Sequence, residues 1–251
     1  MPAIGLKGRN VVIAGGAKNL GGLISRQLAA DGANIAVHYN SEASRAAAEE
    51  TVAAVRAAGA EGFAIQGDLT RIADVTRLFD TAAERLGGID IAINTVGRVL
   101  KKPILETTEA EYDAMFAVNA KSAYFFLQEA GRRLNDNGRI VTIVTSLLAA
   151  FTGLYSTYAG AKAPVEHFTR AAAKEFAPRG ISVVNVAPGP MDTPFFYPAE
   201  DAASIAYHKS QAIGGALTRI EDIAPIVRFL VTEGWWITGQ TIFANGGYTT
   251  R

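Results

Sequence analysis

The order of apolar and polar residues along the chain predicts seven β-strands. Runs such as VVIAG (residues 11–15) and IVTIV (residues 140–144) are apolar at successive positions rather than at alternate ones. Strands with this pattern are covered on both faces, as in parallel sheets that carry helices on either side. The predicted strands are residues 10–15, 33–39, 62–66, 89–94, 139–144, 181–187 and 240–244.

Alanine-rich segments with helical periodicity lie between these strands. The alternation predicts an α/β fold with a doubly wound, Rossmann-like sheet of parallel strands and helices on both faces. No linker or repeat interrupts residues 1–251, so we expect a single domain. Most of the helical segments end at a glycine, which adopts the left-handed conformation of a helix C-terminus with little strain. These glycines are Gly32, Gly59, Gly87, Gly138, Gly180 and Gly234.

One connection, residues 188–218, is much longer than the others and begins PGPMDTPFFYP. Connections of this length are uncommon inside a compact domain and often cover a binding site. We therefore expect a mobile loop over the substrate here.

Composition excludes several classes of function. Lys and Arg number 24, as do Asp and Glu, so no net charge attracts nucleic acid or a membrane surface. The chain has no cysteine and three widely separated histidines, which predicts no metal site. No targeting segment or membrane-spanning run is evident in the sequence, so we expect a cytoplasmic location.

A glycine-rich turn follows the first predicted strand and precedes a helix expected at residues 23–30. Such a turn directs backbone N–H groups and a helix N-terminus at a pyrophosphate, although glycines also occur in turns that bind nothing. Its position in the first βα connection favours a dinucleotide site. The residues expected to contact the cofactor there are Gly15, Lys18, Asn19, Leu20 and Gly21.

The end of the second strand favours NADP over NAD. No carboxylate stands there to bind a ribose hydroxyl, whereas Lys18, Asn40 and Ser41 offer a cation and donors to a 2′-phosphate. His38 is interpreted either as a half-buried histidine or as a phosphate contact. Asp68 either accepts from the adenine amino group or caps the helix expected near residue 72.

Tyr158 and Lys162 lie four residues apart in a segment, residues 155–177, that is expected to be helical, so both project from one face. An ammonium near a phenol lowers the phenol's pKa from about 10 toward that of a working acid or base. Ser146 ends the fifth strand, at the edge where such sheets bind ligands. Ser146 and Asn119 are also explained as ordinary polar residues of a strand end and a helix.

The chain resembles the short-chain dehydrogenase/reductases over its whole length. The motifs that carry the resemblance occur in family order: the turn Gly15 to Gly21, Asp68, Asn94-Thr95-Val96-Gly97, Asn119, Ser146, Tyr158-x-x-x-Lys162, Pro188-Gly189 and Ile237-Thr238-Gly239-Gln240 through Gly246-Gly247.

The resemblance implies a role for each matching residue. Tyr158 is expected to donate a proton to the carbonyl, Lys162 to lower its pKa and bind the nicotinamide ribose, and Ser146 to polarise the substrate oxygen. Asn119 is expected to anchor a proton-relay water. The remaining cofactor contacts implied are Leu69, Asn94, Val96, Gly97, Pro188, Gly189 and Thr193.

The chain departs from the family pattern at several positions. Ala14 replaces a common Thr that ties the glycine turn together, and Asn19 replaces a glycine. Ser146 precedes Tyr158 by 12 residues where many members have 13, which leaves Thr145 as the alternative carbonyl contact. Pro164 lies inside the helix and is expected to kink it.

These residues predict hydride transfer between NADPH and a hydrophobic ketone or aldehyde. The residues expected to line the substrate pocket are Leu148, Phe151, Phe195 and Phe196, which alternatively pack the loop onto the body. One alternative is a 3-oxoacyl-acyl-carrier-protein reductase, for which Arg98, Lys101 and Lys102 would form a basic entrance. Another is an NADP-binding protein without catalysis. The resemblance also implies a homo-oligomer, a tetramer or a dimer, with the Trp235-Trp236 segment in a subunit contact.

Overall fold

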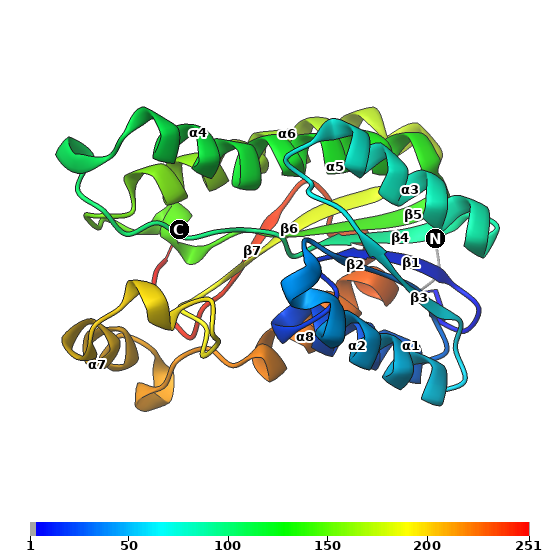
Figure 1. The fold of residues 1–251 in the computed structure, drawn as a ribbon, viewed down its shortest axis with the longest axis horizontal. Helices are drawn as coiled ribbons and strands as arrows, with labels where there is room; N and C mark the ends of the chain where they lie inside the picture. The colour runs from blue at the N-terminus through cyan, green and yellow to red at the C-terminus, as the bar shows by residue number, and fades with distance from the viewer. Residues whose placement is uncertain (1–3, 251) are drawn as a thin grey trace.

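The computed structural model describes residues 4–250, and its core is one parallel sheet with the strand order β3-β2-β1-β4-β5-β6-β7 (Figure 1). All seven predicted strands are present, and every neighbouring pair runs parallel. The strands are β1 Asn10–Ala14, β2 Asn34–Tyr39, β3 Gly62–Gln66, β4 Ile89–Asn94, β5 Leu134–Ile143, β6 Ser182–Pro188 and β7 Thr241–Ala244.

Helices cover both faces of the sheet, as predicted. In Figure 1, α3, α4, α5 and α6 lie above the sheet, and α1, α2 and α8 lie below it. The bounds are α1 Asn19–Ala30, α2 Arg45–Ala57, α3 Ile72–Leu86, α4 Glu109–Phe116, α5 Ser122–Arg133, α6 Ser156–Glu175, α7 Ala202–Ser210 and α8 Ile220–Thr232.

The continuous apolar runs fill two separate cores. Successive side chains of a strand point to opposite faces. Val11 and Ile13 therefore pack with α1, α2 and α8, in a cluster that includes Leu28. Val12 packs on the other face, in a cluster that includes Phe79 of α3. Because both faces are buried, polar residues at the middle of the strands would be costly, and ligands are left to the strand ends.

Two elements begin earlier than the sequence predicts. α1 begins at Asn19 rather than at residue 23, and Asn19 adopts a left-handed conformation with φ 49°. β5 begins at Leu134 rather than at residue 139, with an irregular register opposite β4. Gly138, predicted to end a helix, lies inside β5, because α5 already ends at Arg133 and is followed by the extended Leu134. The neighbouring Asn137, also inside β5, has a left-handed conformation with φ 67°. Asparagine is one of the few residues that tolerates this conformation.

α6 continues through Pro164 as one helix of 20 residues. We call residues 189–219, between β6 and α8, the cap segment. The sequence predicts a mobile loop at residues 188–218 and no helix within it, but the segment contains α7 and short helical turns. Backbone hydrogen bonds from Asp192 to Thr218 (2.8 Å) and from Thr218 to Pro190 (2.9 Å) join its two ends. Among residues 4–250, no helix is long and apolar enough to cross a membrane.

The two-core arrangement makes a testable prediction. Phe79 is fully buried and meets Phe126 edge-on, with 5.0 Å between ring centroids. We expect Phe79→Ala to lower the free energy of unfolding by about 3–5 kcal/mol because it leaves a cavity. Urea unfolding measures this loss. Phe229→Ala removes the same side chain from a site that is 42% exposed and is expected to cost much less; equal losses for the two variants would contradict the packing described.

Candidate active site

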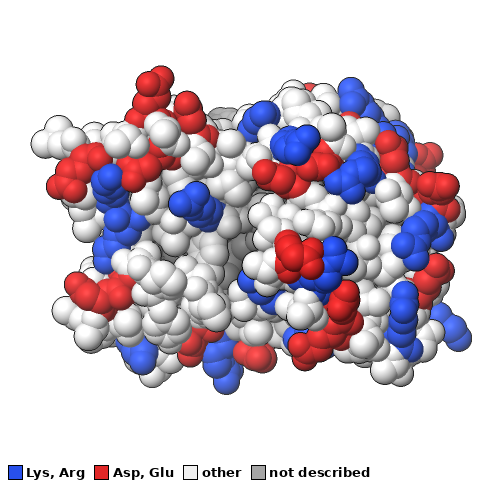
Figure 2. All heavy atoms as spheres, viewed as in Figure 1, with Lys and Arg blue, Asp and Glu red and all other residues white. Residues whose placement is uncertain are grey.

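A cleft of about 630 Å³ lies at the carboxyl ends of the central strands. In Figure 2 the surface is hollowed near the middle of the face shown, and side chains of both charge signs are interspersed around it. Most of the residues predicted to bind a cofactor line the cleft: Gly15, Lys18, Asn19, Leu20, Gly21, Asn40, Asp68, Leu69, Val96, Gly97, Tyr158, Lys162 and Thr193. Four predicted contacts do not line it: Ser41, Asn94, Pro188 and Gly189. Ser44, Thr70 and Val118 are lining residues that the sequence analysis missed.

The glycine turn is held by Thr95, the member of the Asn94-Thr95-Val96-Gly97 motif for which no role was predicted. Thr95 donates its hydroxyl to the Ala14 carbonyl, with 2.9 Å between the oxygens. This bond supplies the tie that was expected to be lost when Ala14 replaced a threonine. A Cβ on Gly21 would lie 2.2 Å from the Gly15 carbonyl oxygen, and Gly15 itself has φ 73°. The turn therefore requires glycine at both positions.

His38 also holds the glycine turn, through a hydrogen bond to the backbone of the turn. Its Nδ1 accepts the Gly15 N–H at 3.1 Å, so in the neutral ring Nε2 donates to the Gly67 carbonyl at 2.8 Å. Burial lowers the pKa of His38 to about 4, which keeps the ring neutral. The side chain is 2% exposed rather than half-buried, and with both nitrogens bound to backbone it is not placed to contact a phosphate.

The residues around the end of β2 present few fixed charges to the cleft. Lys18 is exposed at its rim, and Asn40 and Ser44 line it. Asp68 also lines it, but its Oδ1 accepts hydrogen bonds from the backbone and the hydroxyl of Thr70, at 3.0 and 2.8 Å. Asp68 thus forms a turn before α3, whose N-cap is Arg71.

Tyr158 and Lys162 project from one face of α6 into the cleft, and both are buried. The Lys162 ammonium donates to the carbonyls of Val96 (3.1 Å) and Ile143 (3.0 Å). Burial lowers the pKa of Lys162 to about 8. Burial also raises the pKa of Tyr158 to about 12, against a smaller lowering by its hydrogen bond with Thr145. The expected lowering by Lys162 is not found, because desolvation dominates, and the phenol is protonated at neutral pH.

The hydroxyl that forms a hydrogen bond with Tyr158 belongs to Thr145 rather than to Ser146. Their hydrogen bond opposes the effect of burial on the phenol. Ser146 is 1% exposed and begins a short helical turn, where its carbonyl accepts the Thr249 hydroxyl at 3.3 Å. Both residues line a second pocket, described below. In the sequence, Thr145 precedes Tyr158 by 13 residues, the spacing common in the family, whereas Ser146 precedes it by 12. This spacing was the sequence feature that pointed to Thr145.

Asn119 holds the loop that follows β4. It lies in a π-helical turn, Ala117–Lys121, between α4 and α5. Its amide donates to the carbonyls of Arg98 (2.9 Å) and Met115 (3.0 Å), and its oxygen accepts the Arg98 N–H at 3.1 Å. A Cβ on Gly97 would lie 3.1 Å from both Asn119 Oδ1 and Lys162 Nζ. Asn119 therefore lies beside the ammonium without lining either pocket.

Thr193 offers an unused hydroxyl to the cleft. Its Oγ1 is buried and has no hydrogen-bond partner. Buried hydroxyls are nearly always paired in folded proteins, so an unpaired one on a cleft wall indicates a group that binds a ligand. Asn94, in contrast, is satisfied internally, since its oxygen accepts the Val96 N–H at 2.9 Å.

The second pocket, of about 80 Å³, adjoins the cleft and shares with it Val144, Tyr158, Met191 and Phe195. Phe196, Pro188 and Gly189 also line this pocket. Two other residues predicted to contact the substrate lie elsewhere. Leu148 packs into a small core cluster with Val165, and Phe151 is fully exposed. The remaining lining includes Tyr155, Glu200, His208 and Tyr248.

Comparison with known proteins finds similar sequences that cover nearly the whole chain. A family model described as enoyl-(acyl carrier protein) reductase matches residues 15–249. The short chain dehydrogenase/reductase AacuN of Aspergillus aculeatus is 32% identical, over 96% of each chain. The hydroxynaphthalene reductase-like protein Arp2 of Metarhizium brunneum is 33% identical, over 98% of this chain and 96% of the other.

Solved structures are also similar. A putative dehydrogenase from Burkholderia cenocepacia with bound NADP is 64% identical, with a TM-score of 0.98 over 100% of this chain and 97% of the other. A blue fluorescent protein from a metagenomic library, in complex with NADPH, is 32% identical, with a TM-score of 0.91 over 98% and 100%. From these matches and the arrangement of Tyr158 and Lys162 at the strand ends, the chain belongs to the short-chain dehydrogenase/reductase family of oxidoreductases.

Proposed function

We propose that this protein is an NADPH-dependent oxidoreductase that interconverts a hydrophobic carbonyl compound and the corresponding alcohol. One observation carries the proposal: the buried Tyr158 phenol lies on the wall shared by the cleft and the second pocket, bonded to Thr145 and on the same helix face as Lys162. A ketone in the second pocket and a dinucleotide in the cleft would both meet this phenol.

The cleft fits a nicotinamide dinucleotide. The close-packed Gly15 and Gly21 form an anion cradle at the N-terminus of α1. The unpaired Thr193 hydroxyl would meet the carboxamide, and the Lys162 ammonium the ribose. Lys18 at the rim, with no carboxylate at the end of β2, favours a 2′-phosphate. Similar structures that hold NADP or NADPH support this choice.

When bound, the cofactor supplies the hydride that the carbonyl carbon accepts. Residues of the chain would position the carbonyl oxygen of the substrate and protonate it. The Thr145 hydroxyl would position the carbonyl oxygen against Tyr158, whose pKa of about 12 keeps its proton on the phenol until negative charge develops on the substrate. Tyr158 then gives that proton to the oxygen, and the Lys162 ammonium stabilises the resulting phenolate. Alcohol oxidation follows the same path in reverse.

The walls of the second pocket support an apolar substrate. Val99, Leu147, Phe195 and Phe196 surround the reacting phenol with side chains that offer no charge. The similarity to hydroxynaphthalene reductase-like proteins supports a cyclic, largely apolar substrate.

The description of the matching family model favours an acyl-carrier-protein substrate as a second candidate. Two of the three basic residues that would receive an acidic carrier are engaged within the chain: Lys101 pairs with Glu200 at 2.6 Å and Lys102 with Glu111 at 2.9 Å. Arg98 alone among the three is exposed. A free ketone therefore fits these residues better than a carrier-bound thioester.

We also propose that the protein forms a homo-oligomer, a tetramer in preference to a dimer. Trp236 is 80% exposed and Phe151 fully exposed in the single chain. Large apolar side chains in such positions are commonly covered by a second subunit.

Tyr158→Phe tests the proposed function. The change removes the proton donor and leaves the ring in place, so we expect kcat/KM for ketone reduction to fall by about 10²–10⁴-fold while NADPH still binds. Turnover is followed by NADPH absorbance and binding by NADPH fluorescence. Tyr124→Phe, at an exposed position of α5, is the matched control. Turnover near the wild-type level in Tyr158→Phe would rule out this mechanism.

The pH dependence is set by Lys162. Its ammonium persists below a pKa of about 8 and is lost above it, whereas Tyr158 keeps its proton to about pH 12. We therefore expect kcat/KM for NADPH in the reductive direction, which reports groups of the free enzyme, to be flat near pH 7 and to decline above about pH 8. Circular dichroism across the range controls for unfolding. A profile that stays level to pH 9.5 would contradict this assignment.

Lys18→Ala tests the cofactor preference. Loss of the cation at the rim is expected to weaken NADPH binding by about tenfold and NADH binding much less, because NADH lacks the 2′-phosphate. Titration by cofactor fluorescence measures both constants. Lys174→Ala removes an exposed lysine from the far part of α6 and serves as the control. If Lys18→Ala weakened the binding of NADPH and of NADH equally, Lys18 would not be a contact to the 2′-phosphate.

A further inference from the structure

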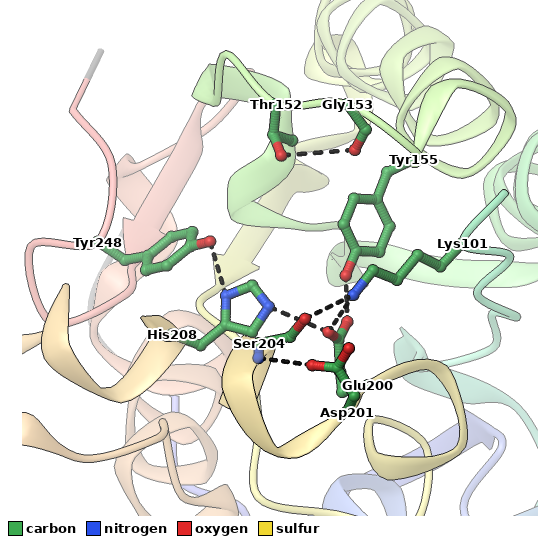
Figure 3. Close-up of polar contacts among 9 residues, drawn as sticks. All are labelled: Lys101, Thr152, Gly153, Tyr155, Glu200, Asp201, Ser204, His208 and Tyr248. Carbon is green, nitrogen blue, oxygen red and sulfur yellow. Dashed lines mark hydrogen bonds and ion pairs between the residues drawn. The ribbon is translucent and has the colours of Figure 1, made fainter. Parts of the chain in front are cut away.

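A buried cluster of polar side chains forms part of the wall of the second pocket, in a segment of the lining that the mechanism does not use. Figure 3 shows Tyr155, Glu200, His208 and Tyr248 converging there with Lys101. They come from four parts of the chain: the loop after β4, the start of α6, the cap segment and the residues that follow β7. All but Lys101 line the pocket.

Glu200 is the centre of this cluster. Its side chain is 2% exposed. One carboxylate oxygen accepts the Lys101 ammonium at 2.6 Å and His208 Nε2 at 3.4 Å, and the other accepts the Tyr155 hydroxyl. Burial and the carboxylate raise the pKa of Tyr155, so the phenol keeps its proton. Because Lys101 balances Glu200, the cluster has no spare positive charge with which to bind an anion.

The direction of each hydrogen bond follows from the carboxylate. An ionised Glu200 only accepts, so both Tyr155 and His208 Nε2 donate to it. In the neutral imidazole His208 Nδ1 is then an acceptor, and the Tyr248 hydroxyl, 2.9 Å away, donates to it. The phenol protons of Tyr155 and Tyr248 are therefore both used inside the cluster.

The two phenol oxygens keep lone pairs that these bonds do not use. Each phenol donates one bond and has acceptor capacity left, and both residues line the pocket. The pocket therefore presents acceptors and no matching free donors in this part of its wall, while Val99, Leu147 and Phe196 give apolar side chains elsewhere in the lining. A group that donates a hydrogen bond fits such a wall, and a carboxylate or phosphate, which only accepts hydrogen bonds when ionised, does not.

We propose that Tyr155 and Tyr248, oriented by Glu200 and His208, form a specificity subsite for a hydroxyl group on the carbonyl substrate. The substrate is then a hydroxylated, otherwise apolar ketone, most simply a cyclic one. This inference rests on the proposed function, because it assigns the pocket beside Tyr158 to the substrate. Glu200 and His208 are positioning residues, since they act through the two tyrosines.

The volume of the pocket limits the size of that substrate. About 80 Å³ is several times the space that one water needs, roughly 10–15 Å³, and well below the roughly 300 Å³ at which drug-sized sites begin. A ring ketone with one small polar substituent suits this space better than a long acyl chain.

Matched sets of ketones test the subsite. Cyclohexanone and 2-tetralone are each compared with a ring-hydroxylated and a ring-methoxylated derivative, as substrates for the wild-type protein with NADPH. The methoxy group accepts a hydrogen bond but cannot donate one. We expect kcat/KM for the hydroxyl form to exceed that for the methoxy form by about tenfold in at least one set, the value of one hydrogen bond.

Variants then assign the preference to the two phenols. Tyr155→Phe and Tyr248→Phe are each expected to lower the ratio of hydroxyl to methoxy kcat/KM, and the double variant to bring it near one. Tyr197→Phe is the control, because Tyr197 lies in the same cap segment, donates to Asp192 at 2.5 Å and lines neither pocket. A merely structural effect would lower kcat/KM for all three ketones of a set alike and leave the ratio unchanged. Thermal unfolding and NADPH binding confirm that each variant is folded.

The outcomes separate this inference from the proposed function. If ketones are reduced in a Tyr158-dependent way but the hydroxyl form has no advantage in either set, the subsite is wrong and the proposed function stands. An advantage that survives in the double variant likewise overturns the role of the two tyrosines. If no ketone of any set is reduced with NADPH, the proposed function fails, and the subsite fails with it.

Discussion

A parallel sheet with helices packed on both faces leaves only the strand ends for chemistry. In this protein the apolar side chains of β1, β4 and β5 fill two cores, one on each side of the sheet. The polar groups that face the cleft and the second pocket lie where the strands stop: the glycine turn after β1, the loop after β4, and Thr145 after β5. The position of the active site follows from the burial of the sheet, and its residues come from the loops at the strand ends and from α6.

Burial also determines the chemistry of the two central side chains. Tyr158 and Lys162 are both buried, and a charge on a buried side chain is unfavourable unless it is matched. The phenol consequently holds its proton more firmly than in solution, and the ammonium holds its proton less firmly. Such a pair is suited to giving a proton to an oxygen that becomes negative. The ammonium is retained by two backbone carbonyls rather than by a carboxylate, so it is available to the phenolate.

Periodicity and short motifs were sufficient to predict the sheet and both helical layers, and with the family resemblance they located the cleft and about half of its lining. They were sufficient because the signals are local: an apolar run makes a strand, and a turn with two glycines lies directly before its helix. Three features depend on contacts between distant segments and were missed. Thr95 reaches Ala14 across 81 residues, Lys101 reaches Glu200 across 99, and α7 forms within a segment that contains no long apolar run. The choice between Thr145 and Ser146 needed the position of the Tyr158 oxygen, which spacing alone left open.

The bond between Thr95 and Ala14 links two positions that a sequence reader would compare with the family one at a time. Position 14 lacks the hydroxyl that is common in the family, and the Thr95 hydroxyl binds the backbone carbonyl of that same residue. The departure at position 14 considered alone suggests a weakened turn, whereas Thr95 supplies a donor from the neighbouring strand's end. Ala14 is fully buried, so a threonine restored there would need space and a hydrogen-bond partner for its own hydroxyl. Because Thr95 already binds this backbone, the family's common residue is no longer the neutral choice at position 14.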